Sequence, residues 1–204
     1  MKWVFWISAA LLVYAYAGYP VCLWIWSRCR RRPVRQAEIF PSISVVMAVH
    51  NEGGVLARKL ESVSDVDYPA ARLEVVVASD GSDDDTNKIL GATSEVRSAI
   101  LESRQGKAAA LNSAVALAQG EIVLFTDARQ RIEPDAIRFL AESFADLSVG
   151  CVSGELMVSE SGTQSQARGL GLYWELEKMV RRLEAEIGST VGATGALYAV
   201  RRNL

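Results

Sequence analysis

The pattern of apolar and polar residues divides the chain into an uncharged beginning and a body in which short apolar runs alternate with amphipathic segments. Residues 3–26 form 24 consecutive positions without a charge. As a helix with a rise of ~1.5 Å per residue, this segment would be about 36 Å long. A bilayer core is ~30 Å thick, so the segment can cross it with some tilt. The pattern therefore predicts a transmembrane helix, with a kink at Pro20.

The residues that flank this segment favour an uncleaved anchor over a signal peptide. Four of the five tryptophans lie at its two ends, where indole rings prefer the headgroup level: Trp3, Trp6, Trp24 and Trp26. A signal peptide would have a shorter apolar region and a small-residue cleavage site, whereas an arginine-rich stretch follows here. Because these arginines outweigh Lys2 before the segment, we expect the N-terminus outside and the body in the cytoplasm, at an inner or plasma membrane. The arginines can also contact anionic membrane lipids.

The body of the chain predicts an α/β fold. Apolar, β-branched runs predict strands at residues 43–49, 73–78, 96–101, 122–125, 149–158 and 195–200. Helical spacing of apolar residues predicts helices at 53–63, 84–90, 107–119, 134–146 and 166–187. This alternation indicates parallel βαβ units in a mostly parallel, Rossmann-like sheet with helices on both faces. Such sheets bind ligands at the carboxyl ends of their strands.

Charge and cysteine content exclude several classes of protein. Residues 1–40 hold six basic residues and one acid, a balance of +5, whereas residues 41–204 hold 16 basic and 23 acidic residues, a balance of −7. An acidic body argues against a nucleic-acid partner, which would need a basic face. Three scattered cysteines and a single histidine make a disulfide scaffold or a zinc module a poor interpretation.

Polar and acidic residues follow three of the predicted strands. His50-Asn51-Glu52 follows the first strand, a run beginning at Asp80 follows the second, and Asp127 follows the strand at 122–125. Neither a glycine-rich dinucleotide fingerprint nor a phosphate loop with a lysine is present. Asp80 and Asp127 at one edge suit a hard divalent cation that bridges a diphosphate. The alternative is a structural turn at Asp80, with Asp84 as a helix cap.

Five motifs occur in order within residues 41–204: Ala48-Val49-His50-Asn51-Glu52; Asp80-Gly81-Ser82-x-Asp84-x-Thr86; Arg104-x-Gly106-Lys107 followed by Ala110-Leu111-Asn112; Asp127-Ala128-Arg129; and the segment from Gly192 through Gly195 to Arg202. Together they resemble the donor-binding half of a family 2 glycosyltransferase with a GT-A fold. The resemblance implies transfer of a sugar from a nucleotide-sugar donor, with a UDP-sugar favoured, to a glycan or lipid acceptor.

The resemblance also implies roles for individual residues. His50 would stack on the nucleotide base, Glu52 and Asp80 would hydrogen-bond the base and ribose, and Lys107 would neutralise donor phosphate. Asp127 would hold Mg²⁺ or Mn²⁺ on the diphosphate. The remaining residues expected to bind the donor are Ala48, Asn51, Gly81, Ser82, Arg104, Gly106 and Gly195.

Two positions depart from the family pattern. Ala48 replaces the usual proline. Arg129 occupies the second acid position of the metal motif, so metal binding is expected to be weaker or to need donor phosphate as a co-ligand. The Arg129 guanidinium can itself contact phosphate.

The resemblance places the general base of the reaction, an Asp, beyond Leu204, and we interpret Glu175 and Glu177 as ordinary residues of an amphipathic helix. We therefore expect an anchor at 1–27, a basic linker at 28–40 and an incomplete donor-binding domain at 41–204. This chain alone is expected to bind a donor without transferring its sugar. The alternatives are a catalytically incomplete nucleotide-sugar-binding module and a polyprenyl-phosphate sugar transferase.

Overall fold

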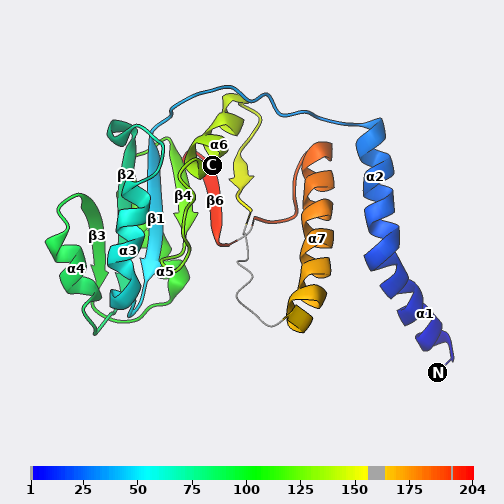
Figure 1. Cartoon of the computed structure of the whole chain (residues 1–204), viewed down its shortest axis with the longest axis horizontal. Coiled ribbons are helices and arrows are strands. Elements are labelled where there is room, and N and C mark those ends of the chain that lie inside the picture. Colours follow the sequence, from blue (N-terminus) through cyan, green and yellow to red (C-terminus); the bar gives the residue numbers. More distant parts are fainter. Residues whose placement is uncertain (1, 156–163, 194) are drawn as a thin grey trace. The chain divides into compact units, whose positions relative to one another are not determined.

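The computed structural model describes residues 2–155, 164–193 and 195–204, and side chains for all of these except 164–173. The chain divides into two compact units (Figure 1). One unit combines Met1–Pro33 with Met157–Gly192, and the other combines Val34–Leu156 with Ala193–Leu204. The domain boundaries expected from the sequence stay a prediction.

The N-terminal unit contains a nearly continuous helix made of α1 (Lys2–Val13), a π-helical turn (Tyr14–Gly18) and α2 (Tyr19–Cys29). It is long and apolar enough to cross a membrane by length and composition. The π-helical turn lies directly before Pro20, and the Tyr19 N–H bonds to the Tyr14 carbonyl five residues earlier. Since proline has no N–H to donate, it disturbs the regular helical ladder, and a wider turn accommodates it. The disturbance expected at Pro20 thus takes the form of a π-helical turn.

Helix α7 (Gln164–Ile187) packs against α2 within the same unit. The Tyr19 hydroxyl donates a hydrogen bond to the Glu184 carboxylate at 2.6 Å, and Arg31 pairs with Glu186 at 2.9 Å. Leu23 and Ser27 of α2 are buried. The carboxyl-terminal half of the apolar helix therefore has protein contacts as well as exposed tryptophans.

The second unit is built on a six-stranded sheet with the strand order β3-β2-β1-β4-β6-β5. The strands are β1 (Ile43–Val49), β2 (Leu73–Asp80), β3 (Val96–Leu101), β4 (Ile122–Thr126), β5 (Cys151–Ser153) and β6 (Leu197–Arg201). The first four pair in parallel, as the sequence predicted. β6 is antiparallel to β4, and β5 is antiparallel to β6. The helix at 166–187 is therefore not the crossover of another parallel βαβ unit, although the alternation in the sequence suggested one.

Helices cover both faces of the sheet. They are α3 (Gly53–Ser64), α4 (Thr86–Ala92), α5 (Lys107–Leu117) and α6 (Ala136–Glu142), with short 3₁₀ turns at Ala70–Arg72 and Ser143–Ala145. Successive residues of a strand point to opposite faces, so Val45 joins the core under α3 and α6, whereas Val46 joins the core under α5. Helix α5 contributes only alanines to the fully buried part of its core, Ala110 and Ala114. Small side chains let this helix approach the sheet closely, and its first residue, Lys107, is thereby fixed near the ends of the strands.

The amino-terminal edge of the sheet holds a structural carboxylate, Glu74. It accepts hydrogen bonds from the Ser44 hydroxyl and from the N–H groups of Gln119 and Gly120. Partial burial alone would raise the pKa of Glu74, but these hydrogen bonds outweigh it, and the pKa lies below its ordinary value. Glu74 thus fastens the turn between α5 and β4 at the edge opposite the strand ends that carry the motifs.

Candidate donor site

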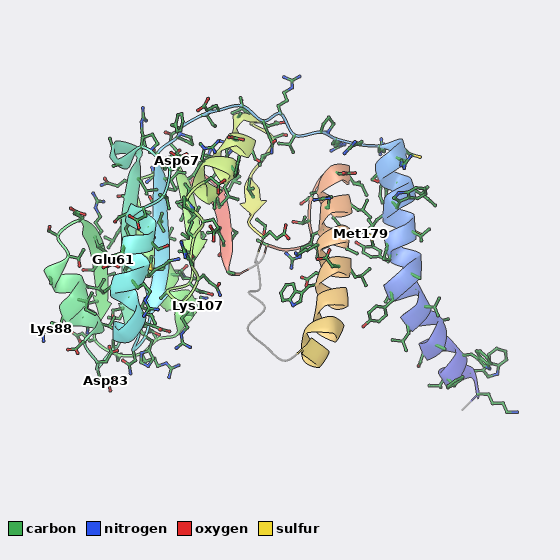
Figure 2. The ribbon with its side chains drawn as sticks, in the orientation of Figure 1. Glu61, Asp67, Asp83, Lys88, Lys107 and Met179 are labelled. Atoms are coloured by element: carbon green, nitrogen blue, oxygen red, sulfur yellow. The ribbon has the colours of Figure 1, made fainter. Side chains whose placement is uncertain are left out.

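The strand-end motifs gather at one edge of the sheet in the second unit. Figure 2 shows Asp83 and Lys107 toward the same end of the sheet and Asp67 at the opposite end. Because β1, β2 and β4 are parallel, the loops that follow them leave the sheet on the same side. The loop before α5 joins them there, as the contacts below show.

Asp80, the last residue of β2, holds the loop that leads into α5. Its side chain is almost completely buried, with the residue 4% exposed. One carboxylate oxygen accepts the N–H of Gln105 at 2.6 Å, and the other accepts the N–H of Gly106 at 2.9 Å. A carboxylate bonded to two backbone donors is a strong local tether. Asp80 therefore fixes the start of α5, a role that sequence reasoning missed.

Two glycines make this tether possible. Gly81 has a φ of 63°, and a Cβ there would lie 2.5 Å from the backbone nitrogen of Arg104. Gly106 has a φ of 96°, a conformation that side chains rarely adopt. Gly81 thus permits the close approach of two loops, whereas Gly106 permits the positive φ just before α5. Arg104 itself is exposed on the loop before α5.

The loop after β1 is locked to the loop after β2. Asn51 adopts a φ of 54°, and its amide donates to the Asp83 carboxylate at 2.6 Å and accepts the Asp83 N–H at 3.0 Å. The Ser82 hydroxyl accepts the Asn51 N–H at 3.1 Å. His50 contacts the Asp80 carbonyl through Nδ1 at 2.7 Å. Since a carbonyl oxygen can only accept, His50 donates this hydrogen bond through Nδ1–H.

Two ion pairs bring the charged residues of the motifs together. Lys107 Nζ lies 2.5 Å from Asp127 Oδ1, and Arg129 Nε lies 3.0 Å from Glu52 Oε1. Lys107 and Arg129 are largely exposed, with side chains 60% and 75% accessible, whereas the Glu52 side chain is 19% accessible. Two cations and two carboxylates from three chain segments therefore meet at one edge of the sheet. The sequence placed each residue there but indicated neither pair.

The arrangement offers few protein ligands to a metal ion. Within the described residues, no group of three or more His, Cys, Asp or Glu side chains could hold one. Asp127 supplies hard carboxylate oxygens of the kind that Mg²⁺ and Mn²⁺ prefer. A cation at Asp127 would thus need oxygens from the donor phosphates or from water to complete its ligand set, which fits the replacement of the second acid by Arg129.

Other predicted residues contribute to the framework. Ala48 packs with the core under α5. Asp84 accepts the N–H groups of Thr86 and Gly53, but the N-cap residue of α4 is Asp85, one position later than the sequence predicted. Gly195 is exposed in the turn before β6. Glu177 pairs with Arg181 one turn along α7 at 2.7 Å.

Arg201, in the last motif, makes hydrogen bonds to backbone carbonyl groups. Its guanidinium donates to the carbonyls of Phe144, Asp146 and Val149 and lies over the Phe144 ring. Arg201 therefore ties β6 to the segment that leads into β5, a structural role that its place in the motif did not reveal.

Comparison with known proteins identifies the family. Residues 44–204 match the family described as Glycosyl transferase family 2. The chain belongs to this family. A β-monoglucosyldiacylglycerol synthase of Synechocystis is 27% identical over 144 residues, which cover 68% of this chain and 30% of the relative. An N-acetylglucosaminyltransferase of Rhizobium meliloti is 29% identical over 175 residues, which cover 80% of this chain and 40% of the relative.

Solved structures confirm the GT-A type of fold. A mannosyltransferase from Pyrobaculum calidifontis, in complex with GDP-Man and Mn²⁺, matches 96% of this chain and 55% of its own at 28% identity, with a TM-score of 0.76. The TarS protein of S. aureus in complex with UDP-GlcNAc matches 61% of this chain and 37% of its own at 26% identity, with a TM-score of 0.53. The chain spans 30% of the length of the Synechocystis relative and 40% of the length of the Rhizobium relative. It is thus related to a part of these glycosyltransferases.

Proposed function

We propose that this family 2 glycosyltransferase chain binds the nucleoside diphosphate of its sugar donor at the edge where Asp127, Lys107 and Arg129 meet. The Lys107–Asp127 contact carries the proposal. It brings together a carboxylate that can hold a metal ion and an ammonium group that can bind a phosphate oxygen, and a metal-bound diphosphate requires both. When a donor binds, Lys107 turns to a phosphate oxygen and Asp127 becomes free to hold Mg²⁺ or Mn²⁺. The cation would neutralise the leaving diphosphate, as divalent ions do in phosphate chemistry.

The neighbouring side chains complete the proposed donor site. Arg129 adds a second positive charge, and Glu52 keeps its guanidinium oriented through a charge-assisted hydrogen bond. His50, oriented by its Nδ1 contact, offers a ring face for the base. Asp80 contributes indirectly, because it fixes the loop that directly precedes Lys107.

A UDP-sugar is the donor we favour, and the sugar acceptor is proposed to be a glycan or a lipid. TarS binds UDP-GlcNAc and the mannosyltransferase binds GDP-Man, so the base is the part of the donor that needs a direct test. The Synechocystis relative is named as a synthase of a glucosyl diacylglycerol, which supports a lipid rather than a glycan as one possible acceptor. That this chain alone transfers no sugar stays a prediction.

Calorimetric titration of the full chain in detergent tests donor binding. We expect UDP or GDP to bind more tightly with MnCl₂ than with EDTA, and ADP to bind more weakly in both conditions. The gain with Mn²⁺ reflects a charge-assisted bridge between Asp127 and the diphosphate. If neither UDP nor GDP binds in the presence of Mn²⁺, the proposed site is wrong.

We also propose that α1 and α2 anchor the chain in a membrane with the second unit in the cytoplasm. The proposal rests on the apolar helix Lys2–Cys29 and on the arginines at its end and beyond it. A reporter that works only in the cytoplasm, fused after Leu204, should be active. A reporter that works only outside the cytoplasm, fused at the same position, should be inactive. Activity of that reporter would show that the orientation is the opposite of the one proposed.

A further inference from the structure

Helix α3 carries a buried cation, Lys59, that the motifs do not include. Lys59 is 3% exposed and lies on the face of α3 that packs on the sheet. Its Nζ donates to the Thr126 hydroxyl at 3.0 Å and to the Gln130 carbonyl at 2.5 Å. Removing an ammonium group from water is costly unless it is well hydrogen-bonded. The two acceptors therefore explain how the chain tolerates a lysine in its core.

Both acceptors belong to the turn that carries Asp127. Thr126 is the last residue of β4, and the Gln130 N–H closes the turn by donating to the Asp127 carbonyl at 3.2 Å. Lys59 thus bridges the two ends of the five-residue segment Thr126–Gln130. Within this segment, Asp127 contacts Lys107 on α5, and Arg129 contacts Glu52. The turn is held from the α3 side while its acid meets α5 on the other face of the sheet.

The positive charge of Lys59 would support donor binding in addition to its hydrogen bonds. Burial lowers the pKa of Lys59 to about 8, and the nearby Asp127 carboxylate opposes that shift. A positive charge on Lys59 would also favour a diphosphate bound near the turn, in addition to keeping the turn in place.

We propose that Lys59 is a positioning residue of the donor site, which fixes the Thr126–Gln130 turn so that Asp127 and Arg129 can meet the diphosphate. This inference rests on the proposed function for its effect on donor binding. Its structural half, the ordering of the turn by Lys59, can be judged without any ligand.

The Lys59→Met variant tests the proposal, because methionine retains an unbranched apolar side chain and loses the donor. Hydrogen exchange of the Gln130 amide should become faster by at least about tenfold relative to amides in β1. In the presence of MnCl₂, affinity for UDP or GDP, whichever binds the unmodified chain, should fall about tenfold or more, the usual scale for groups that support a metal ligand. Thr126→Val, which removes one acceptor and retains the cation, should give a smaller change in the same direction.

Val63→Ala provides the matched control. Val63 lies one turn further along the same face of α3 and is buried, so its truncation lowers stability through a cavity. It should leave the exchange of the Gln130 amide relative to β1, and nucleotide affinity, unchanged. If Lys59→Met behaves like Val63→Ala in both measurements, Lys59 is only a packing residue and the proposal is overturned. If no nucleotide binds the unmodified chain, the proposed function fails, and the exchange measurement still decides whether Lys59 orders the turn.

Discussion

Replacing Asp80 by alanine is expected to lower the free energy of unfolding of the second unit by about 3 kcal/mol, since it removes a buried carboxylate that accepts two backbone N–H groups. The donors are the N–H groups of Gln105 and Gly106, which now bond to the two carboxylate oxygens. The loop before α5 would lose its tether, and Lys107 would lose its fixed position. Nucleotide affinity should therefore fall together with stability.

Denaturation of the full chain in detergent, followed by circular dichroism, measures the stability change, and hydrogen exchange at Gln105 and Gly106 shows whether the loss is local. Asp80→Asn should also be destabilising, because an amide nitrogen cannot accept the second N–H. Asp85→Ala is the matched control, since the Asp85 side chain is 79% exposed and such positions usually change stability by less than about 0.5 kcal/mol. Equal stability of the Asp80 and Asp85 variants would show that the tether is not needed.

The first part of the sheet was predictable because its pattern is unambiguous. Strand β1 is apolar except for Ser44 and is buried on both faces, and the loops that follow β1, β2 and β4 carry polar motifs. The direction of the strands was harder to predict at the β6–β5 edge of the sheet. The three residues of β5 give too short a pattern to determine pairing, and only the structure shows that β6 runs against β4.

The sequence predicted where the charged residues gather and missed how they contact one another. The expected hydrogen bond from Asp80 to the base or ribose stays a prediction, and what the sequence missed is that the Asp80 oxygens hold backbone N–H groups. Such a role depends on a loop 25 residues away, which no local pattern reveals. A signal for Lys59 was available, because it lies between Leu56 and Val63 at helical spacing and so falls within the apolar stripe of α3.

Replacing Asp127 by alanine is expected to remove most of the Mn²⁺-dependent gain in nucleotide affinity, a loss of about 1–3 kcal/mol if one charge-assisted contact disappears. Stability should change little, because Asp127 is 38% exposed and pairs with a lysine that is 60% exposed. Exposed pairs of this kind contribute at most about 1 kcal/mol. Asp127 thus differs from Asp80, for which stability and binding should fall together.

Lys107→Met separates the two halves of the Asp127 pair. If Lys107 turns to a phosphate oxygen when the donor binds, this variant should weaken UDP or GDP binding both with MnCl₂ and with EDTA. Asp127→Ala should weaken binding only with MnCl₂, since it removes the metal ligand and frees Lys107 for phosphate. Glu133→Ala, at an exposed acid nearby in sequence, should alter neither titration. A retained Mn²⁺ effect in Asp127→Ala would contradict the assignment of Asp127 as the metal ligand, because the cation would then depend on other oxygens of the site.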